Sequence, residues 1–255
     1  MAKEGRASMD GDTVGSRREG AALQSEDVYL YEGGVVEEER KRDITRLRIG
    51  PQVKDIPRSA FEGCINLAEV RFDEGALQSI GDYAFSGCKA LQHVTIPPSV
   101  TKLGTCAFWG CINLADIHFN VEIRHVRGIF MIINGLQNIG TGAFYECRAL
   151  QQVAIPSSVT KLGTSAFRNC CKLTEVQLNV GLQVIGKCAF YNCPLLQSVA
   201  VPSSVTELKQ EAFGGCANLA EVILLEEIGS LTGDSSTGVF QVVKELSARE
   251  DYSTR

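Results

Sequence analysis

One motif recurs along the chain at a nearly constant interval and constrains the fold more than any other feature. The repeat is marked by Phe61, Phe85, Phe108, Phe144, Phe167, Phe190 and Phe213, which are separated by steps of 24, 23, 36, 23, 23 and 23 residues. Alanine always precedes this phenylalanine, cysteine follows it three residues later, and leucine follows it six residues later. Internal repetition at roughly 20 to 29 residues indicates a solenoid, whose coils bury their apolar side chains against one another.

Two hydrophobic periods follow each other within a coil. If the phenylalanine is position 0, the residues at 0, +3 and +6 fit one face of a short helical turn. The next segment, for example Leu91 to Ile96, alternates like a strand with one buried face. The glycine at −4, as in Gly104, suits a tight turn with positive φ. The sequence therefore predicts an α/β repeat, with a parallel β-sheet on one face and short helices or helical turns on the other.

The repeat also predicts how the chain is divided. About seven coils occupy residues 44–225, and residues 27–43 (including DVYLYEGGVV) are expected to cap the first coil. Residues 1–26 are polar and glycine-rich, so we expect disorder there. The period fails in residues 226–255, which we interpret as a degenerate repeat or C-terminal cap with a frayed tail. Residues 121–133 are an insertion that joins a basic segment to an apolar run, and it is either a functional loop or an error of gene prediction.

These units are similar to a known repeat family. AFSGCKALQHVTIPPSVTKLG and AFRNCCKLTEVQLNVGLQVIG resemble the BspA-like (Treponema pallidum type) leucine-rich repeat. The lead-in DITRLRIGPQVKDIPRSAFEGC resembles the start of such arrays in the predicted repeat proteins of diatoms. The resemblance implies a curved leucine-rich-repeat solenoid that serves as a binding scaffold. Bacterial members of this family are often surface proteins with export signals.

Seven of the ten cysteines form a column at position +3, and we expect them to be buried, reduced thiols that act as small hydrophobic residues. They are Cys64, Cys88, Cys111, Cys147, Cys170, Cys193 and Cys216. Thiols stacked in register point the wrong way for a disulfide, and a column spreads metal ligands apart. Of the other three, Cys106 and Cys188 share position −2, and with Cys171 they are candidate exposed, reactive thiols.

Two sets of residues are candidates for partner binding. The first is an aromatic ribbon at position +1, formed by Trp109, Tyr145, Arg168 and Tyr191, residue types that are enriched at interface hot spots. The alternative for the ribbon is lateral packing of rings between coils. The second set is the acidic members of an outward column on the concave sheet, Glu69, Asp116, Glu175 and Glu221, which would recognise a basic or polar peptide or else form a solvated face. His93, Asp116 and His118 lie on adjacent strands, but we expect no metal site there.

Composition and motifs exclude several functions. The balance of 25 basic and 30 acidic side chains does not favour nucleic-acid binding. No apolar run reaches the ~18 to 20 residues that span a membrane, and the first twenty residues lack the apolar core of a signal peptide. No phosphate-binding glycine loop, nucleophile elbow or zinc-spaced set occurs, so we expect neither an enzyme nor a cofactor.

Three hypotheses remain. The first is a cytoplasmic, monomeric scaffold that binds a protein or peptide on its concave sheet or along the aromatic ribbon. The second is a cell-surface or secreted adhesion protein of the same repeat family whose export signal is missing from this sequence. The third is a repeat array that only fills space in a larger assembly.

Overall fold

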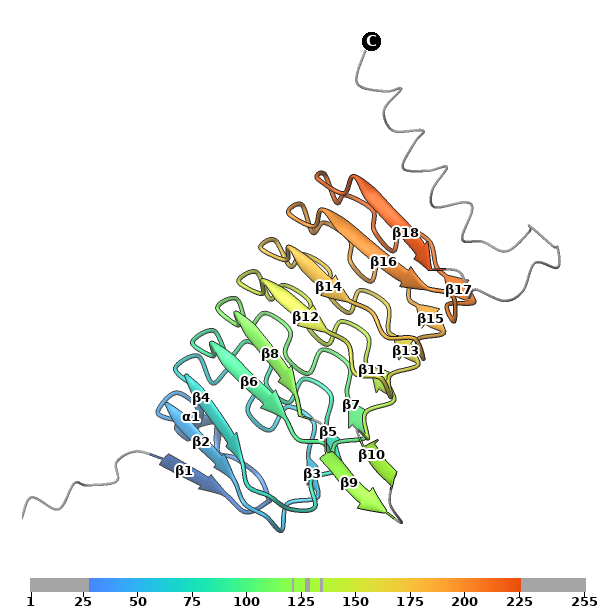
Figure 1. The fold of residues 1–255 in the computed structure, drawn as a ribbon. Helices are drawn as coiled ribbons and strands as arrows, with labels where there is room; N and C mark the ends of the chain where they lie inside the picture. The colour runs from blue at the N-terminus through green and yellow to red at the C-terminus, as the bar shows by residue number, and fades with distance from the viewer. Residues whose placement is uncertain (1–27, 121, 127–128, 134, 226–255) are drawn as a thin grey trace, which may run out of the picture.

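The computed structural model describes residues 28–120, 122–126, 129–133 and 135–225. These residues form a stack of coils, each containing one long strand, one short strand and a run of turns (Figure 1). The expectations for residues 1–26 and 226–255 concern parts of the chain outside the described ranges.

The long strands lie side by side and pair in parallel, because successive coils have the same direction. They follow the order β1 (Val28–Tyr31), β2 (Arg46–Ile49), β4 (Glu69–Phe72), β6 (His93–Ile96), β8 (Asp116–Phe119), β12 (Gln152–Ala154) and β14 (Glu175–Gln177). The stack continues with the paired strands β16 (Ser198–Pro202) and β18 (Glu221–Leu225). Alternate side chains are buried, as the period of two predicted. We call this surface the long-strand sheet.

Two-residue strands form a second parallel sheet along the stack (Figure 1). They are β3 (Asp55–Ile56), β5 (Ser79–Ile80), β7 (Lys102–Leu103), β11 (Asn138–Ile139), β13 (Lys161–Leu162), β15 (Val184–Ile185) and β17 (Glu207–Leu208). The second residue of each is the aliphatic residue at position −5, which is turned toward the core. This second sheet was not predicted from the sequence.

The predicted helices around each phenylalanine are wrong: the segment is a run of turns. Of the described residues, only Glu38–Lys41 (α1) form a helix. The backbone has positive φ at −2 and +2, for example +57° at Ser59 and +76° at Gly63, which a right-handed helix does not allow. Alternate N–H groups therefore point along the stack toward the next coil. For example, the N–H of Phe61 donates to the carbonyl of Ala84 in the next coil at 2.8 Å. The turn runs are thus joined by a third ladder of hydrogen bonds between coils.

The glycine at −4 has a different role from the predicted one. None of these glycines has positive φ in the structure. Instead, the coils approach so closely that a Cβ at Gly140 would lie 2.4 Å from the carbonyl oxygen of Gly104. A Cβ at Gly163 would similarly lie 2.6 Å from the amide nitrogen of Thr141. Glycine is needed here for close packing of backbones, not for turn geometry.

The phenylalanines form a continuous stack through the core. Neighbouring rings are stacked, 5.1 to 5.5 Å apart between centroids and nearly parallel, with interplanar angles of 4° to 14°. At the N-terminal end, Tyr31 of β1 lies edge-on against Phe61 at 5.1 Å. The Nζ of buried Lys41 donates to Glu38 and to the carbonyl of Ser59. Strand β1 and helix α1 therefore cover the first coil.

The inserted residues form an antiparallel hairpin rather than a loop without secondary structure. Its strands are β9 (Glu122–Val126) and β10 (Ile129–Ile133). The hairpin lies where the chain passes from long strand β8 to short strand β11 (Figure 1). The stack continues in parallel from β8 to β12, so the insertion does not interrupt the solenoid.

Candidate functional site

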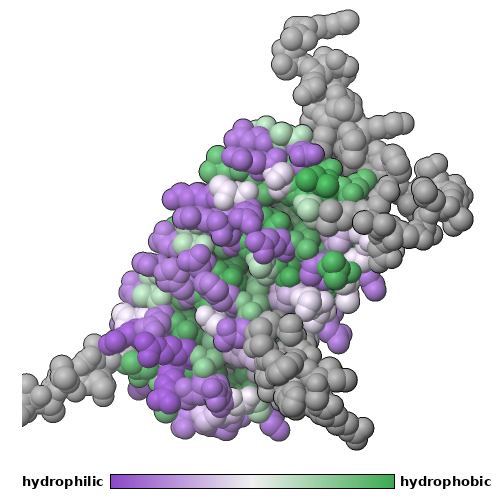
Figure 2. Space-filling model, in the orientation of Figure 1, coloured by the Kyte–Doolittle hydropathy of each residue, from purple (hydrophilic) through white to green (hydrophobic). Residues whose placement is uncertain are grey.

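A groove of about 890 Å³ lies on the long-strand sheet, at the ends of β4 and β6. It is lined by Glu69, Val70, Arg71, Phe72, Asp73, Glu74, Gly75, His93, Thr95, Pro97, Pro98, Ser99 and Asn120. The segment from the start of β4 to the end of β5 is one residue longer than the corresponding segment from β6 to β7. This extra residue lies in the turn that includes Asp73, Glu74 and Gly75, which forms one wall of the groove. Figure 2 shows hydrophilic residues over much of this face, with hydrophobic residues emerging between them.

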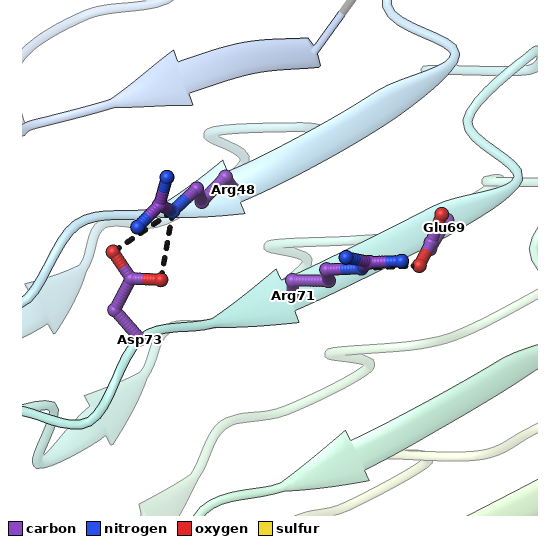
Figure 3. Close-up of polar contacts among 4 residues, drawn as sticks. All are labelled: Arg48, Glu69, Arg71 and Asp73. Atoms are coloured by element: carbon purple, nitrogen blue, oxygen red, sulfur yellow. Dashed lines mark hydrogen bonds and ion pairs between the residues drawn. The ribbon is translucent and has the colours of Figure 1, made fainter. Parts of the chain in front are cut away.

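Two ion pairs include residues that line the groove (Figure 3). The Nε of Arg48 donates to both carboxylate oxygens of Asp73, at 2.8 and 3.0 Å, and this hydrogen bond raises the pKa of Arg48. The Nε of Arg71 lies 2.5 Å from Oε1 of Glu69 on the same strand. Because 75% of the Arg71 side chain is exposed, water screens this pair strongly. Such pairs hold their geometry weakly and can exchange partners at little free-energy cost.

The acidic residues of the outward column are distributed along the whole sheet. Parallel register places Glu69 beside His93 and His93 beside Asp116. The Nδ1 of His93 lies 3.0 Å from Oδ2 of Asp116. Glu175 instead accepts a hydrogen bond from Gln177 at 2.7 Å, and Glu221 lies on β18 at the far end of the stack. Of these four acidic residues, Glu69 alone lines the groove, together with its neighbour His93.

The aromatic ribbon is a row of side chains that contact one another between coils. Trp109 and Tyr145 pack edge to face with centroids 6.2 Å apart. The guanidinium carbon of Arg168 lies 5.9 Å from the Tyr145 ring centroid and 4.6 Å from that of Tyr191. These contacts are the lateral packing that was the alternative interpretation. Trp109 nevertheless remains 41% exposed, so part of the residue is available to a partner.

Two residues extend this row and were missed by the sequence analysis. Tyr83 packs edge to face against Trp109 at 6.5 Å, and Arg58 lies over the Tyr83 ring at 5.2 Å. Tyr83 occupies position −2, where positive φ turns its side chain toward the +1 side chain of the next coil. The signal was an aromatic residue at −2 immediately before the coil that carries Trp109.

The cysteine column is buried and reduced throughout. From the second coil onward, each Sγ lies near the phenylalanine carbonyl of the preceding coil, for example Cys111 and Phe85 at 3.2 Å. Burial raises the pKa of the Cys64 thiol to about 12 and also raises the pKa of Cys111, Cys147 and Cys170. These thiols are therefore neutral, weakly nucleophilic core groups.

The prediction of exposed, reactive thiols is wrong for Cys188, which is only 6% exposed. Cys106 is half-buried, and burial raises its pKa, which lowers its thiolate fraction. Its thiol in turn raises the pKa of neighbouring Tyr83. Cys171 is half-buried, with its Sγ near the carbonyl of Asn169.

The described ranges contain neither a cluster of metal ligands nor a membrane-spanning helix. In these ranges no group of three or more His, Cys, Asp or Glu side chains is arranged to hold a metal ion. No helix among them is long and apolar enough to cross a membrane.

Comparison with known proteins identifies the repeat. The model of the BspA type leucine-rich repeat region matches residues 39–131 and 128–235, with six copies. A leucine-rich repeat protein of Treponema pallidum is 28% identical, with a TM-score of 0.55 over 79% of this chain and 86% of that chain. One from Eubacterium ventriosum is 26% identical, with a TM-score of 0.57 over 74% of this chain, which spans only 46% of that protein. No curated protein matches the sequence. With more than half of its residues matched by the family model, the chain belongs to the BspA-type leucine-rich repeat family.

Proposed function

We propose that this chain is a non-catalytic interaction scaffold that binds a segment of a partner protein in the groove of the long-strand sheet. The observation that carries the proposal is the groove itself, a hollow of about 890 Å³ bordered by exposed charged side chains. Stacked coils present a long continuous surface suited to protein binding. The proposal places the partner in the cytoplasm, a reducing compartment that suits the column of core thiols.

The charges at the groove support a polar or charged partner segment. Arg71 and Glu69 pair only with each other among the described contacts, and both side chains are substantially exposed. An exposed pair of this kind contributes less than about 1 kcal/mol to stability. Each member can therefore pair with an opposite charge on the partner without a large loss of folding free energy.

Site-specific photo-cross-linking tests this proposal. A photoreactive residue at Thr95 lies in the groove, whereas one at Ala154 occupies the same outward column on β12, outside the groove. Both variants are introduced into the full chain and irradiated in extracts of the source cell. A protein cross-linked from Thr95 and not from Ala154 supports binding in the groove, and Arg71→Glu should weaken that product. A partner cross-linked equally from both positions, or from neither, would contradict it.

A further inference from the structure

Arg168, in the aromatic ribbon, is held between two tyrosine rings from the adjacent coils. Its guanidinium carbon lies 4.6 Å from the Tyr191 centroid and 5.9 Å from the Tyr145 centroid. Rings at these distances attract a cation electrostatically. They also restrict the rotamers of a long side chain that would otherwise be flexible. The guanidinium is thus positioned before any ligand arrives.

The charge of Arg168 is not neutralised by a carboxylate within the described part of the chain. Arg48, Arg71 and Arg148 each pair with an acidic side chain, but no such pair involves Arg168. Its Nε is buried and has no hydrogen-bond acceptor among the described residues. Glu146, whose backbone N–H donates to the carbonyl of Arg168, directs its carboxylate to Arg148 at 3.4 Å. A fixed cation without an anion is therefore built into the ribbon.

The surroundings of Arg168 combine polar and apolar groups. The Nδ2 of Asn169 donates to the Tyr145 hydroxyl at 3.4 Å, and the Nδ2 of Asn192 donates to Oδ1 of Asn169 at 3.0 Å. On the other side of Tyr145 lies Trp109, which is 41% exposed. A planar guanidinium binds a carboxylate through two parallel hydrogen bonds, and partial exclusion of water by flanking rings strengthens them.

We propose that the aromatic ribbon binds an acidic peptide segment of a partner protein, with one carboxylate on Arg168 and an apolar side chain against Trp109. The two residues are two coils apart, or ~10 Å at the spacing of neighbouring strands. An extended peptide covers this distance in ~3 residues. Arg58 and Arg168, the described arginines that lie over rings of this row, are four coils apart and do not form a cluster. A lone guanidinium suits a carboxylate, whereas phosphoryl groups are usually recognised by clusters of arginines.

This site is independent of the groove proposed above. It lies on the turn runs, and none of its residues lines the groove. The binding of one partner segment does not require the other. An experiment on Arg168 can therefore fail while the groove proposal holds, and the reverse is also true.

Two capped synthetic peptides provide the test. One is Ac-Leu-Ala-Ala-Glu-NH2, and the matched control replaces Glu with Gln, which removes the charge with little change of shape. Each is titrated into the full 15N-labelled chain while the Nε–H resonance of Arg168 is followed by NMR. The fluorescence of Trp109 is followed in parallel, since it is the only tryptophan in the sequence. We expect the Glu peptide to shift the Arg168 resonance, to change the Trp109 emission and to bind about tenfold more tightly than the Gln peptide.

Variants and a third peptide give further tests. Arg168→Gln should abolish the preference for Glu, whereas Lys161→Gln, at an exposed position of the second sheet outside both proposed sites, should leave it unchanged. Equal binding of the two peptides, or an unmoved Arg168 resonance at about 10 mM Glu peptide, would overturn the proposal. Tighter binding of a phosphoserine peptide than of the Glu peptide would also overturn it, in favour of a phosphoryl ligand. The comparison of the two peptides on the wild-type chain does not depend on whether Arg168→Gln folds.

Discussion

Replacement of Gly140 by alanine tests why the −4 position is glycine. Two explanations are available for such a residue, a left-handed backbone and a close approach of coils. Gly140 does not have positive φ, but an added Cβ would meet three backbone atoms of the preceding coil at 2.4 to 2.6 Å. Gly87 is the matched control, because its φ is +71° and an added Cβ would meet nothing closer than 3.9 Å.

The expected magnitudes follow from these geometries. At Gly87, the left-handed conformation costs an L-residue about 1–2 kcal/mol, offset by about 0.4–1 kcal/mol from reduced entropy of the unfolded chain. Gly87→Ala should therefore lower the free energy of unfolding by about 1 kcal/mol. At Gly140, the contact must open from 2.4 Å to the ordinary 3.4 Å, and the obstructing atoms belong to the backbone. Overpacking of this kind costs about 1–3 kcal/mol or more, so we expect about 3 kcal/mol for Gly140→Ala.

Urea denaturation followed by far-UV circular dichroism measures both variants. Trp109 fluorescence gives a second transition, and coincidence of the two transitions shows whether the stack unfolds as one unit. If Gly140→Ala destabilises the chain less than Gly87→Ala does, the explanation by close coil approach is refuted.

Three further predictions concern the core, the end of the stack and the surface. Burial raises the pKa of Cys64 from 9.0 to about 12, so between these pH values the thiol ionises in the unfolded chain before it does in the folded one. The free energy of unfolding should therefore fall as the pH rises from 9 toward 12, and it should fall less steeply in Cys64→Ala. The amide of Phe190 donates to the carbonyl of Ala212 at 2.7 Å, whereas no described residue accepts from the amide of Phe213. Hydrogen exchange should therefore be at least about a hundredfold slower at the Phe190 amide than at the Phe213 amide. Equal protection of the two amides would show that the third ladder continues beyond Phe213. Arg71→Gln removes an exposed ion pair and should change the free energy of unfolding by less than about 1 kcal/mol, so a larger loss in urea denaturation would show a structural role for the pair.

The repeat predicted the core and the register of the long-strand sheet because both depend on spacing alone. Phenylalanine, cysteine and leucine at 0, +3 and +6 are buried in the structure, except that Leu219 of the last coil is partly buried. Glu69, His93 and Asp116 lie in a row. The helical interpretation failed because a period near three also fits a run of turns. Residues at +2 carried the missing signal: six of the seven are glycine or asparagine, which tolerate the left-handed conformation found there, and Glu146 is the exception.

The groove and the environment of Arg168 were less accessible from sequence. The groove depends on how one turn, longer by a single residue, lies against the turn of the next coil. The position of Arg168 at +1 was evident, but its placement between two rings follows from side-chain packing across three coils. Periodicity predicts which residues share a column, whereas the contacts within the column require the three-dimensional structure.

The central claim is that the chain binds a partner segment in the groove of the long-strand sheet. Hydrogen–deuterium exchange of the purified chain, with and without the partner obtained by cross-linking from Thr95, tests it most directly. The account predicts slower exchange in β4, β6 and residues 97–99, with β14 and β16 unchanged. Unchanged exchange around the groove when the partner is bound would contradict the claim.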